Sequence, residues 1–157
     1  FRNLGNGWFA EVSAQAGDAF RRPEVGRAAA FGDIDNDGDI DVLVTNNIGP
    51  ARLWRNEVGR GKAWLQVRLA APGGNPRGYG SRVLVSGKGL APLVRRVGPS
   101  GSYLAASDPV AHFGLGDHQG PVVVRVEWLG GPAEEWTIEK VRQRVTLRRG
   151  SGKPAVP

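Results

Sequence analysis

The chain has 157 residues, no cysteine, two histidines and a formal net charge of +6. The lack of cysteine excludes disulfides, thiolate metal centres and cysteine nucleophiles, and no apolar run approaches the roughly 20 residues of a membrane-spanning helix. The 24 glycines and 11 prolines are spread between short apolar runs, which is typical of a loop-rich, all-β chain. No methionine occurs, even at residue 1, so we expect a processing site or a longer parent chain upstream.

The first 59 residues predict one small β unit. Short apolar or alternating stretches bounded by Gly, Asn or Pro are typical of strands. Four such stretches cover residues 8–13, 28–31, 41–45 and 52–56. The opening residues FRNLGNG are echoed by WRNEVG about one repeat length later, and four strands with one such period make about one propeller blade.

An acidic loop joins the second and third of these expected strands. It has the spacing D-x-D-x-D-G-x-x-D, and its members are Asp33, Asp35, Asp37, Asp39 and Asp41. Carboxylates this close repel one another unless a cation joins them. Ca²⁺ accepts six to eight oxygens in the irregular geometry of a loop, whereas Mg²⁺ prefers a strict octahedron. The spacing therefore predicts a calcium site, with magnesium or a solvated acidic turn as alternatives.

Positions in the pattern assign a role to each aspartate. We expect the first three to supply side-chain oxygens, Asp39 to offer its backbone carbonyl with its side chain pointing outward, and Asp41 to close the shell. Gly38 permits the sharp turn. The loop is not an EF-hand, because that motif needs a glutamate at position twelve, where Val44 stands.

The segments FRNLGNGWFAEVS, FGDIDNDGDIDVLVTNN and ARLWRNE resemble the FG-GAP/VCBS-type repeat of integrin-like β-propellers over residues 1–58. The resemblance implies calcium binding by the same five aspartates. A single blade cannot bury both of its faces. We therefore expect it to pack on the second half of the chain, on upstream blades or on another chain.

The second half predicts a β-sandwich or open barrel of about seven strands. Residues 63–69 alternate apolar and polar side chains as a half-buried strand does, and residues 87–89 suggest a hairpin turn. The expected strands cover residues 63–69, 82–85, 93–97, 110–113, 121–128, 135–138 and 144–147.

The segments GYGSRVLVSG, GPSGSYLAASDPVAHFGLGD, VVVRVEWLGG and RVTLRR resemble the ASPIC/UnbV domain over about residues 62–149. That domain follows FG-GAP/VCBS repeats in secreted proteins, including the cartilage acidic protein family. The resemblance implies an extracellular setting with adhesion or matrix association. It divides the chain into a repeat over residues 1–59, an ASPIC/UnbV-like β domain over 60–150 and a tail over 151–157.

These features predict a calcium-binding extracellular adhesion or binding module without catalysis, in which calcium is structural. Ser102, Asp108 and His112 lie close in sequence, but no G-x-S-x-G elbow occurs and a catalytic triad is set by spatial geometry. We expect His112 to be a hydrogen-bonded structural residue.

Two alternatives follow from charge and from strand edges. Residues 1–60 have a net charge of −2 and residues 61–157 a net charge of +8, so the basic half could bind a polyanion or glycan. Unpaired blade edges could instead join chains into a fibre or oligomer by strand exchange. No recognition motif for nucleic acid occurs, and no membrane span is expected.

Overall fold

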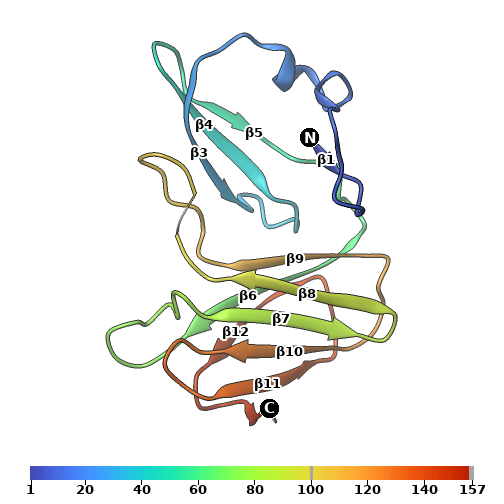
Figure 1. The fold of residues 1–157 in the computed structure, drawn as a ribbon, viewed down its shortest axis with the longest axis vertical. Coiled ribbons are helices and arrows are strands. Elements are labelled where there is room, and N and C mark those ends of the chain that lie inside the picture. Colours follow the sequence, from blue (N-terminus) through green and yellow to red (C-terminus); the bar gives the residue numbers. More distant parts are fainter. Residues whose placement is uncertain (100, 156–157) are drawn as a thin grey trace.

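The computed structural model describes residues 1–99 and 101–155. Its regular elements are β-strands, except for two short 3-10 turns at Ser13–Gln15 and Asp18–Arg21. The all-β expectation is confirmed. Figure 1 shows an N-terminal sheet standing above a larger body made by the second half of the chain. Among the described residues, no helix has the length and apolar character needed to cross a membrane.

The N-terminal sheet contains three antiparallel strands in the order β3-β4-β5. These strands are β3 (Gly26–Gly32), β4 (Asp41–Asn46) and β5 (Arg52–Trp54). Between β3 and β4 runs the acid loop, defined here as residues 33–41. In Figure 1 this loop lies at the lower end of the sheet, facing the second body.

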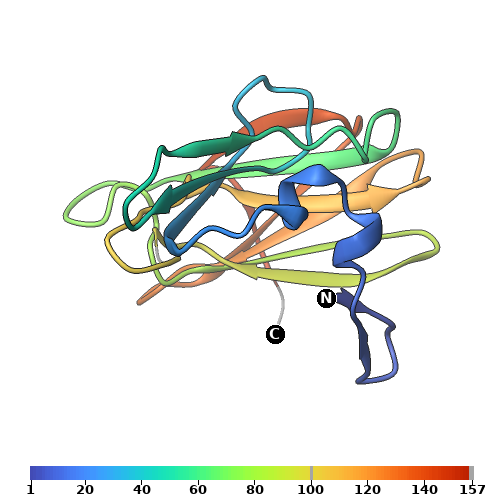
Figure 2. The same ribbon diagram turned by 90° about the horizontal axis from the view of Figure 1, so that it is seen from above.

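The expected strand over residues 8–13 does not join this sheet. Only β2 (Phe9–Ala10) is extended, and it pairs with β1 (Arg2–Asn3) in a separate two-stranded sheet. The side chain of Asn3 accepts a hydrogen bond from the N–H of Gly5 at 2.8 Å, so the chain turns back on itself. Figure 2 shows this hairpin projecting from the rest of the molecule.

The second half of the chain forms two sheets with the strand orders β13-β11-β10-β7-β8 and β12-β6-β9. The pairing is antiparallel except between β12 and β6, which run parallel. The strands are β6 (Ala63–Ala70), β7 (Arg82–Gly87), β8 (Leu90–Arg96), β9 (Ala111–Gly116), β10 (Val122–Glu127), β11 (Ala133–Ile138), β12 (Gln143–Arg148) and β13 (Lys153–Pro154).

Each of the seven stretches expected from the sequence overlaps one of these strands, although the bounds differ by a few residues. Strand β13 lies where a tail was expected, and pairs with β11 through Glu134 and Glu135. The buried carboxylate of Glu134 accepts hydrogen bonds from the N–H groups of Gly150 and Gly152, which holds the turn before β13. The described strands do not close into a barrel, and we call this two-sheet body the sandwich.

Alternating side chains of the two sheets meet in one apolar core. In β6, Leu65 and Val67 are fully buried, and they pack with Val85, Val124 and other apolar side chains of the facing sheet. This alternation follows from the strand repeat of two, which sends successive side chains to opposite faces. The opposite face of β6 should then be solvated, yet part of it is buried under the acid loop.

A loop of the sandwich also covers the free edge of β3. The N–H of Phe31 donates to Ser107 Oγ at 3.2 Å, and its carbonyl accepts from the N–H of Asp108 at 3.0 Å. The guanidinium of Arg27 lies 5.9 Å from the ring centre of Tyr103 in the same loop. Uncovered strand edges invite pairing with other chains, so the second half of the chain protects one edge of the N-terminal sheet.

Candidate metal centre

The acid loop brings three carboxylates together. Oxygen atoms of Asp33, Asp35 and Asp37 all lie within 4.8 Å of one another. The loop curls tightly because Asn36 and Gly38 both have left-handed backbone conformations, with φ of 60° and 97°. Asn tolerates this region better than most residues, and glycine enters it without a steric cost.

Asp33 holds the loop in this shape. It is 9% exposed, and its Oδ1 accepts from the N–H of Asp37 at 3.2 Å while its Oδ2 accepts from the N–H of Gly38 at 3.1 Å. A carboxylate hydrogen-bonded to backbone N–H groups within a loop acts as a local cap. The geometry of the cluster therefore depends on its first member.

One oxygen of the cluster has no hydrogen-bond donor. Asp37 Oδ1 accepts from the N–H of Asp39 at 2.9 Å, but Asp37 Oδ2 is buried without a hydrogen-bond partner, and Arg60 Nε lies 3.9 Å away. Leaving such an oxygen unpaired costs free energy. A cation between the three carboxylates would satisfy it, and a set of oxygen ligands alone suits Ca²⁺ or Mg²⁺. The residues present therefore fit a hard divalent ion.

The other two aspartates lie apart from the cluster. Asp39 Oδ2 accepts from the N–H of Gly59 at 2.9 Å, so its side chain is engaged outside the cluster. Gly59 permits this approach, because a Cβ there would lie 2.0 Å from Asp39 Oδ1. Asp41 is 1% exposed and accepts from the N–H groups of Ile34 and Asn56 at 2.9 and 2.8 Å. Both side chains fasten the loop to the segment that follows β5.

Two arginines lie at the rim of the cluster. Arg55 Nη1 is 3.5 Å from Asp35 Oδ2, and both Arg55 and Arg60 form ion pairs with Glu57. The hydrogen bond to Glu57 raises the pKa of Arg55 above its ordinary value, and the charges of Asp35 and Asp37 add to this effect. These exposed cations offset part of the acidic charge in a screened environment.

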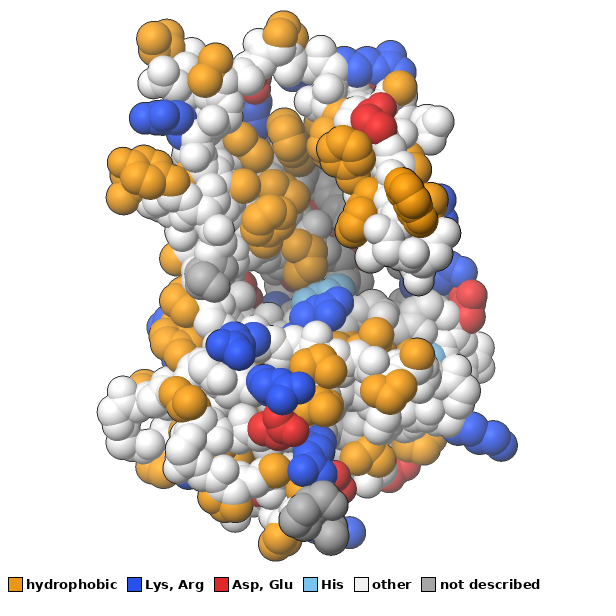
Figure 3. Space-filling model, in the orientation of Figure 1, with side chains coloured by type: hydrophobic (Ala, Val, Ile, Leu, Met, Phe, Trp, Pro, Cys, Tyr) orange, Lys and Arg blue, Asp and Glu red, His pale blue; other side chains and the backbone are white. Residues whose placement is uncertain are grey.

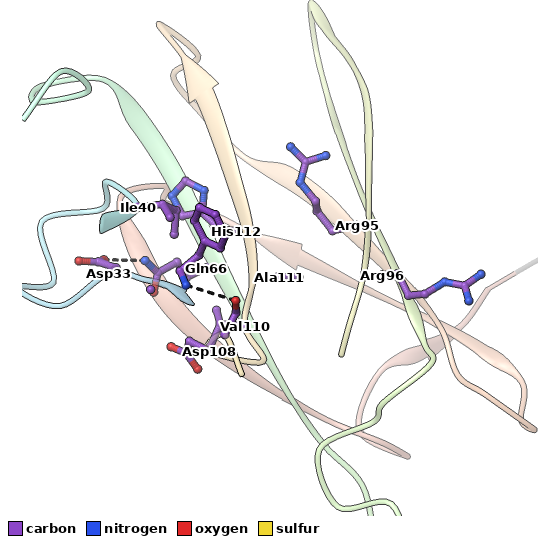
Figure 4. Close-up of a pocket in the computed structure, with 12 residues that line it drawn as sticks. Asp33, Ile40, Gln66, Arg95, Arg96, Asp108, Val110, Ala111 and His112 are labelled. Atoms are coloured by element: carbon purple, nitrogen blue, oxygen red, sulfur yellow. Dashed lines mark hydrogen bonds between the residues drawn. The ribbon is translucent and has the colours of Figure 1, made fainter. Parts of the chain in front are cut away.

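Gln66 connects the cluster to the sandwich. Its side chain lies on the face of β6 opposite the core and is 1% exposed. Its Nε2 donates to Asp33 Oδ2 at 2.6 Å, and its Oε1 accepts from Arg144 Nε at 2.6 Å. Because a carboxylate only accepts and a guanidinium only donates, these partners fix the orientation of the amide. Figure 4 shows Asp33 and Gln66 facing each other.

A second contact joins the turn of the loop to β9 and β6. His112 Nε2 is 2.6 Å from the carbonyl oxygen of Gly38. A carbonyl only accepts, so Nε2 carries the proton, and Nδ1 of the neutral ring keeps its lone pair. A Cβ on Gly38 would lie 2.1 Å from Trp64 Nε1. Only glycine permits the loop to sit this closely on the sandwich.

The contacts of Gln66 and Trp64 with the acid loop were not predicted from the sequence. His112 was expected only to be a hydrogen-bonded structural residue. The signal for Gln66 is faint: a polar residue in an outward position of a strand is ordinary. His112 and Ser102 do not form a triad, since no hydrogen bond among residues 1–99 and 101–155 joins Ser102, Asp108 and His112.

Comparison with known families gives the domain its affiliation. Residues 71–154, more than half of the chain, match the family described as ASPIC and UnbV. The chain belongs to the ASPIC and UnbV family. The matched region contains His112 and Arg144. Trp64 and Gln66 of β6 lie before it in the chain.

The chain is also similar to cartilage acidic protein 1 from three vertebrates. Identity is 29% to the Homo sapiens and Mus musculus proteins and 28% to the Xenopus tropicalis protein, over 118 residues and 73% of this chain in each case. The match covers 18% of the length of each relative. The similarity therefore concerns a small part of those proteins.

The hydrogen bonds of Gln66 yield a testable prediction. Gln66→Ala removes a donor from Asp33 and an acceptor from Arg144, so the free energy of unfolding should fall by about 1–3 kcal/mol. Urea unfolding followed by circular dichroism measures this change. Arg68→Ala is the matched control, because Arg68 is an exposed residue of the same strand, and its effect should stay within about 0.5 kcal/mol. Equal losses in the two variants would contradict a docking role for Gln66.

Proposed function

We propose that the chain is a calcium-binding, extracellular adhesion or binding module without catalysis, in which the calcium is structural. In this proposal residues 1–59 are an FG-GAP/VCBS-type repeat, residues 60–150 are the ASPIC/UnbV domain, and residues 151–157 are a tail. The observation that carries the calcium proposal is the donorless, buried Asp37 Oδ2 beside the carboxylates of Asp33 and Asp35.

The proposed ion would be held by Asp33, Asp35 and Asp37, with the Asp39 carbonyl and Asp41 as further ligands. It would supply positive charge where three carboxylates repel one another. Irregular loop geometry favours Ca²⁺ over Mg²⁺. Because Asp33 also accepts from Gln66, an ion that orders the loop would also order its contact with the sandwich.

An extracellular location is supported by the similarity to cartilage acidic protein 1. Extracellular modules commonly bind Ca²⁺ with a Kd of roughly 10⁻⁴–10⁻³ M, and a small loop site suits that range. The absence of catalysis is proposed because the sequence carries no nucleophile elbow and His112 Nε2 is engaged by a backbone carbonyl.

Calcium removal tests the metal directly. An ion that binds only the folded chain adds about 2.7 kcal/mol to the free energy of unfolding at a hundredfold excess over Kd. EDTA should therefore lower Tm, and millimolar Ca²⁺ should restore it, as measured by differential scanning calorimetry.

Single substitutions test which residues are responsible for the rise in Tm with Ca²⁺. Asp35→Asn should abolish the rise in Tm with Ca²⁺, because it removes one charge from the cluster. Asp18→Asn should leave that rise intact, because the Asp18 side chain is 92% exposed and outside the loop. A rise in Tm that survives in the Asp35 variant would refute the ligand assignment.

A second candidate function is self-association through the N-terminal sheet. Figure 3 shows hydrophobic side chains lining a hollow in the upper half of the molecule, and in the N-terminal sheet Leu43 and Leu53 are exposed. Strand β5 has no further strand paired to its outer edge among the described residues. The partner we propose is a second copy of the chain, because two such edges can pair antiparallel with each other.

Light scattering on purified protein tests this association. The unmodified chain should show a concentration-dependent rise in mass, and Leu53→Lys should hold it at the monomer mass because a buried charge in the contact is costly. Leu129→Lys is the control, since Leu129 is also more than half exposed but lies on the sandwich. A monomer mass at every concentration for the unmodified chain would remove this candidate.

A further inference from the structure

A cavity of about 350 Å³ lies where the N-terminal sheet meets the sandwich. We call it the joint cavity, and its size is at the lower end of the range for small-molecule sites. Figure 4 shows side chains from both bodies around it. The residues used below are Phe31, Ile40, Arg95, Asp108, Val110 and His112.

Two arginines of β8, Arg95 and Arg96, line the joint cavity. The guanidinium carbon of Arg95 is 5.7 Å from the ring centre of Phe113, and one of the N–H groups of Arg95 donates to the carbonyl of Val94. No carboxylate in residues 1–99 or 101–155 forms an ion pair with Arg95, whereas Arg82 on the neighbouring strand pairs with Glu127 at 3.0 Å. The guanidinium therefore keeps donors available for a ligand.

The two arginines differ in their contacts. Figure 4 shows their side chains running in different directions, as expected of successive residues in a strand. Both line the cavity, and the guanidinium of Arg95 also lies beside Phe113. We therefore assign the contact with an anionic ligand to Arg95.

The other walls offer hydrogen-bond acceptors and apolar surface. The carboxylate of Asp108 is exposed, and Nδ1 of His112 is an acceptor when its ring is neutral, because Nε2 donates to Gly38. Phe31 is 45% exposed, and Ile40 and Val110 extend the apolar lining. Cationic side chains, hydrogen-bond acceptors and an aromatic side chain are therefore gathered around one small space.

We propose that the joint cavity binds a single acidic sugar of the uronic acid class. The sugar carboxylate pairs with Arg95, which suits planar oxyanions. Its hydroxyl groups donate to Asp108 and to His112 Nδ1, and the apolar C–H face of the ring packs against Phe31. A peptide carboxylate would satisfy Arg95 but leave these acceptors unused, and Pro92 in β8 removes a donor that an added peptide strand would need.

The ligand side of the test uses the unmodified protein. Isothermal titration with sodium glucuronate should show saturable binding to one site. Glucuronamide has the same ring without the charge, and acetate has the charge without the ring. Both should bind at least about tenfold more weakly, the loss expected when a charge-assisted hydrogen bond or the ring contacts are missing.

Substitution of two arginines tests the protein side of the contact. Arg95→Gln removes the guanidinium and should weaken glucuronate binding about tenfold. Arg82→Gln is the control and should leave the affinity unchanged, because Arg82 is paired with Glu127 and lies outside the lining of the cavity. Melting curves establish that both variants are folded, and if the Arg95 variant is not, the comparison of glucuronate with glucuronamide decides alone.

Three results would overturn the proposal. These are no saturable glucuronate binding, equal affinity in the Arg95 and Arg82 variants, or acetate, sulfate or a short peptide with a free carboxylate binding as tightly as glucuronate. Arg95, Asp108 and Phe31 lie outside the acid loop, and the titrations are run with and without Ca²⁺. The calcium proposal and this one can therefore fail separately.

Discussion

The hydrogen bonds of the buried Asp33 carboxylate hold the two halves of the molecule together. Within the acid loop it accepts from the N–H groups of Asp37 and Gly38, and from the sandwich it accepts from Gln66. Burying a carboxylate is expensive unless its oxygens find donors. Here the donors come from both bodies, so the shape of the loop and its docking on the sandwich depend on the same charge.

Each body also covers a strand edge or a strand face of the other. The sandwich loop that contains Ser107 and Asp108 protects the edge of β3, and the acid loop covers the outward face of β6. The sandwich has an apolar core of its own, whereas the three-stranded N-terminal sheet leaves Leu43 and Leu53 exposed. The N-terminal sheet therefore depends on its neighbour more than the sandwich does.

Local pattern was enough to locate the sandwich strands β6 to β12 and the position of the acid loop, but not β13. Alternation of apolar side chains is a property of neighbouring residues, and so is the D-x-D-x-D-G-x-x-D spacing. The short pairing of β1 with β2 was not foreseen. The local pattern of residues 8–13 indicates a strand but does not specify which strand it pairs with. The hydrogen bond that Asp39 accepts from Gly59 was not foreseen, because Gly59 lies beyond β5 in the chain. The role of Gln66 is likewise set by contacts far apart in sequence.

We propose that a divalent ion in the acid loop completes the contact between the two bodies. The decisive measurement is anomalous difference density, recorded at a long wavelength from crystals grown with Ca²⁺. We expect a peak among the carboxylates of Asp33, Asp35 and Asp37, with Gln66 still bonded to Asp33. Carboxylates turned toward solvent, with no anomalous peak between them, would contradict it.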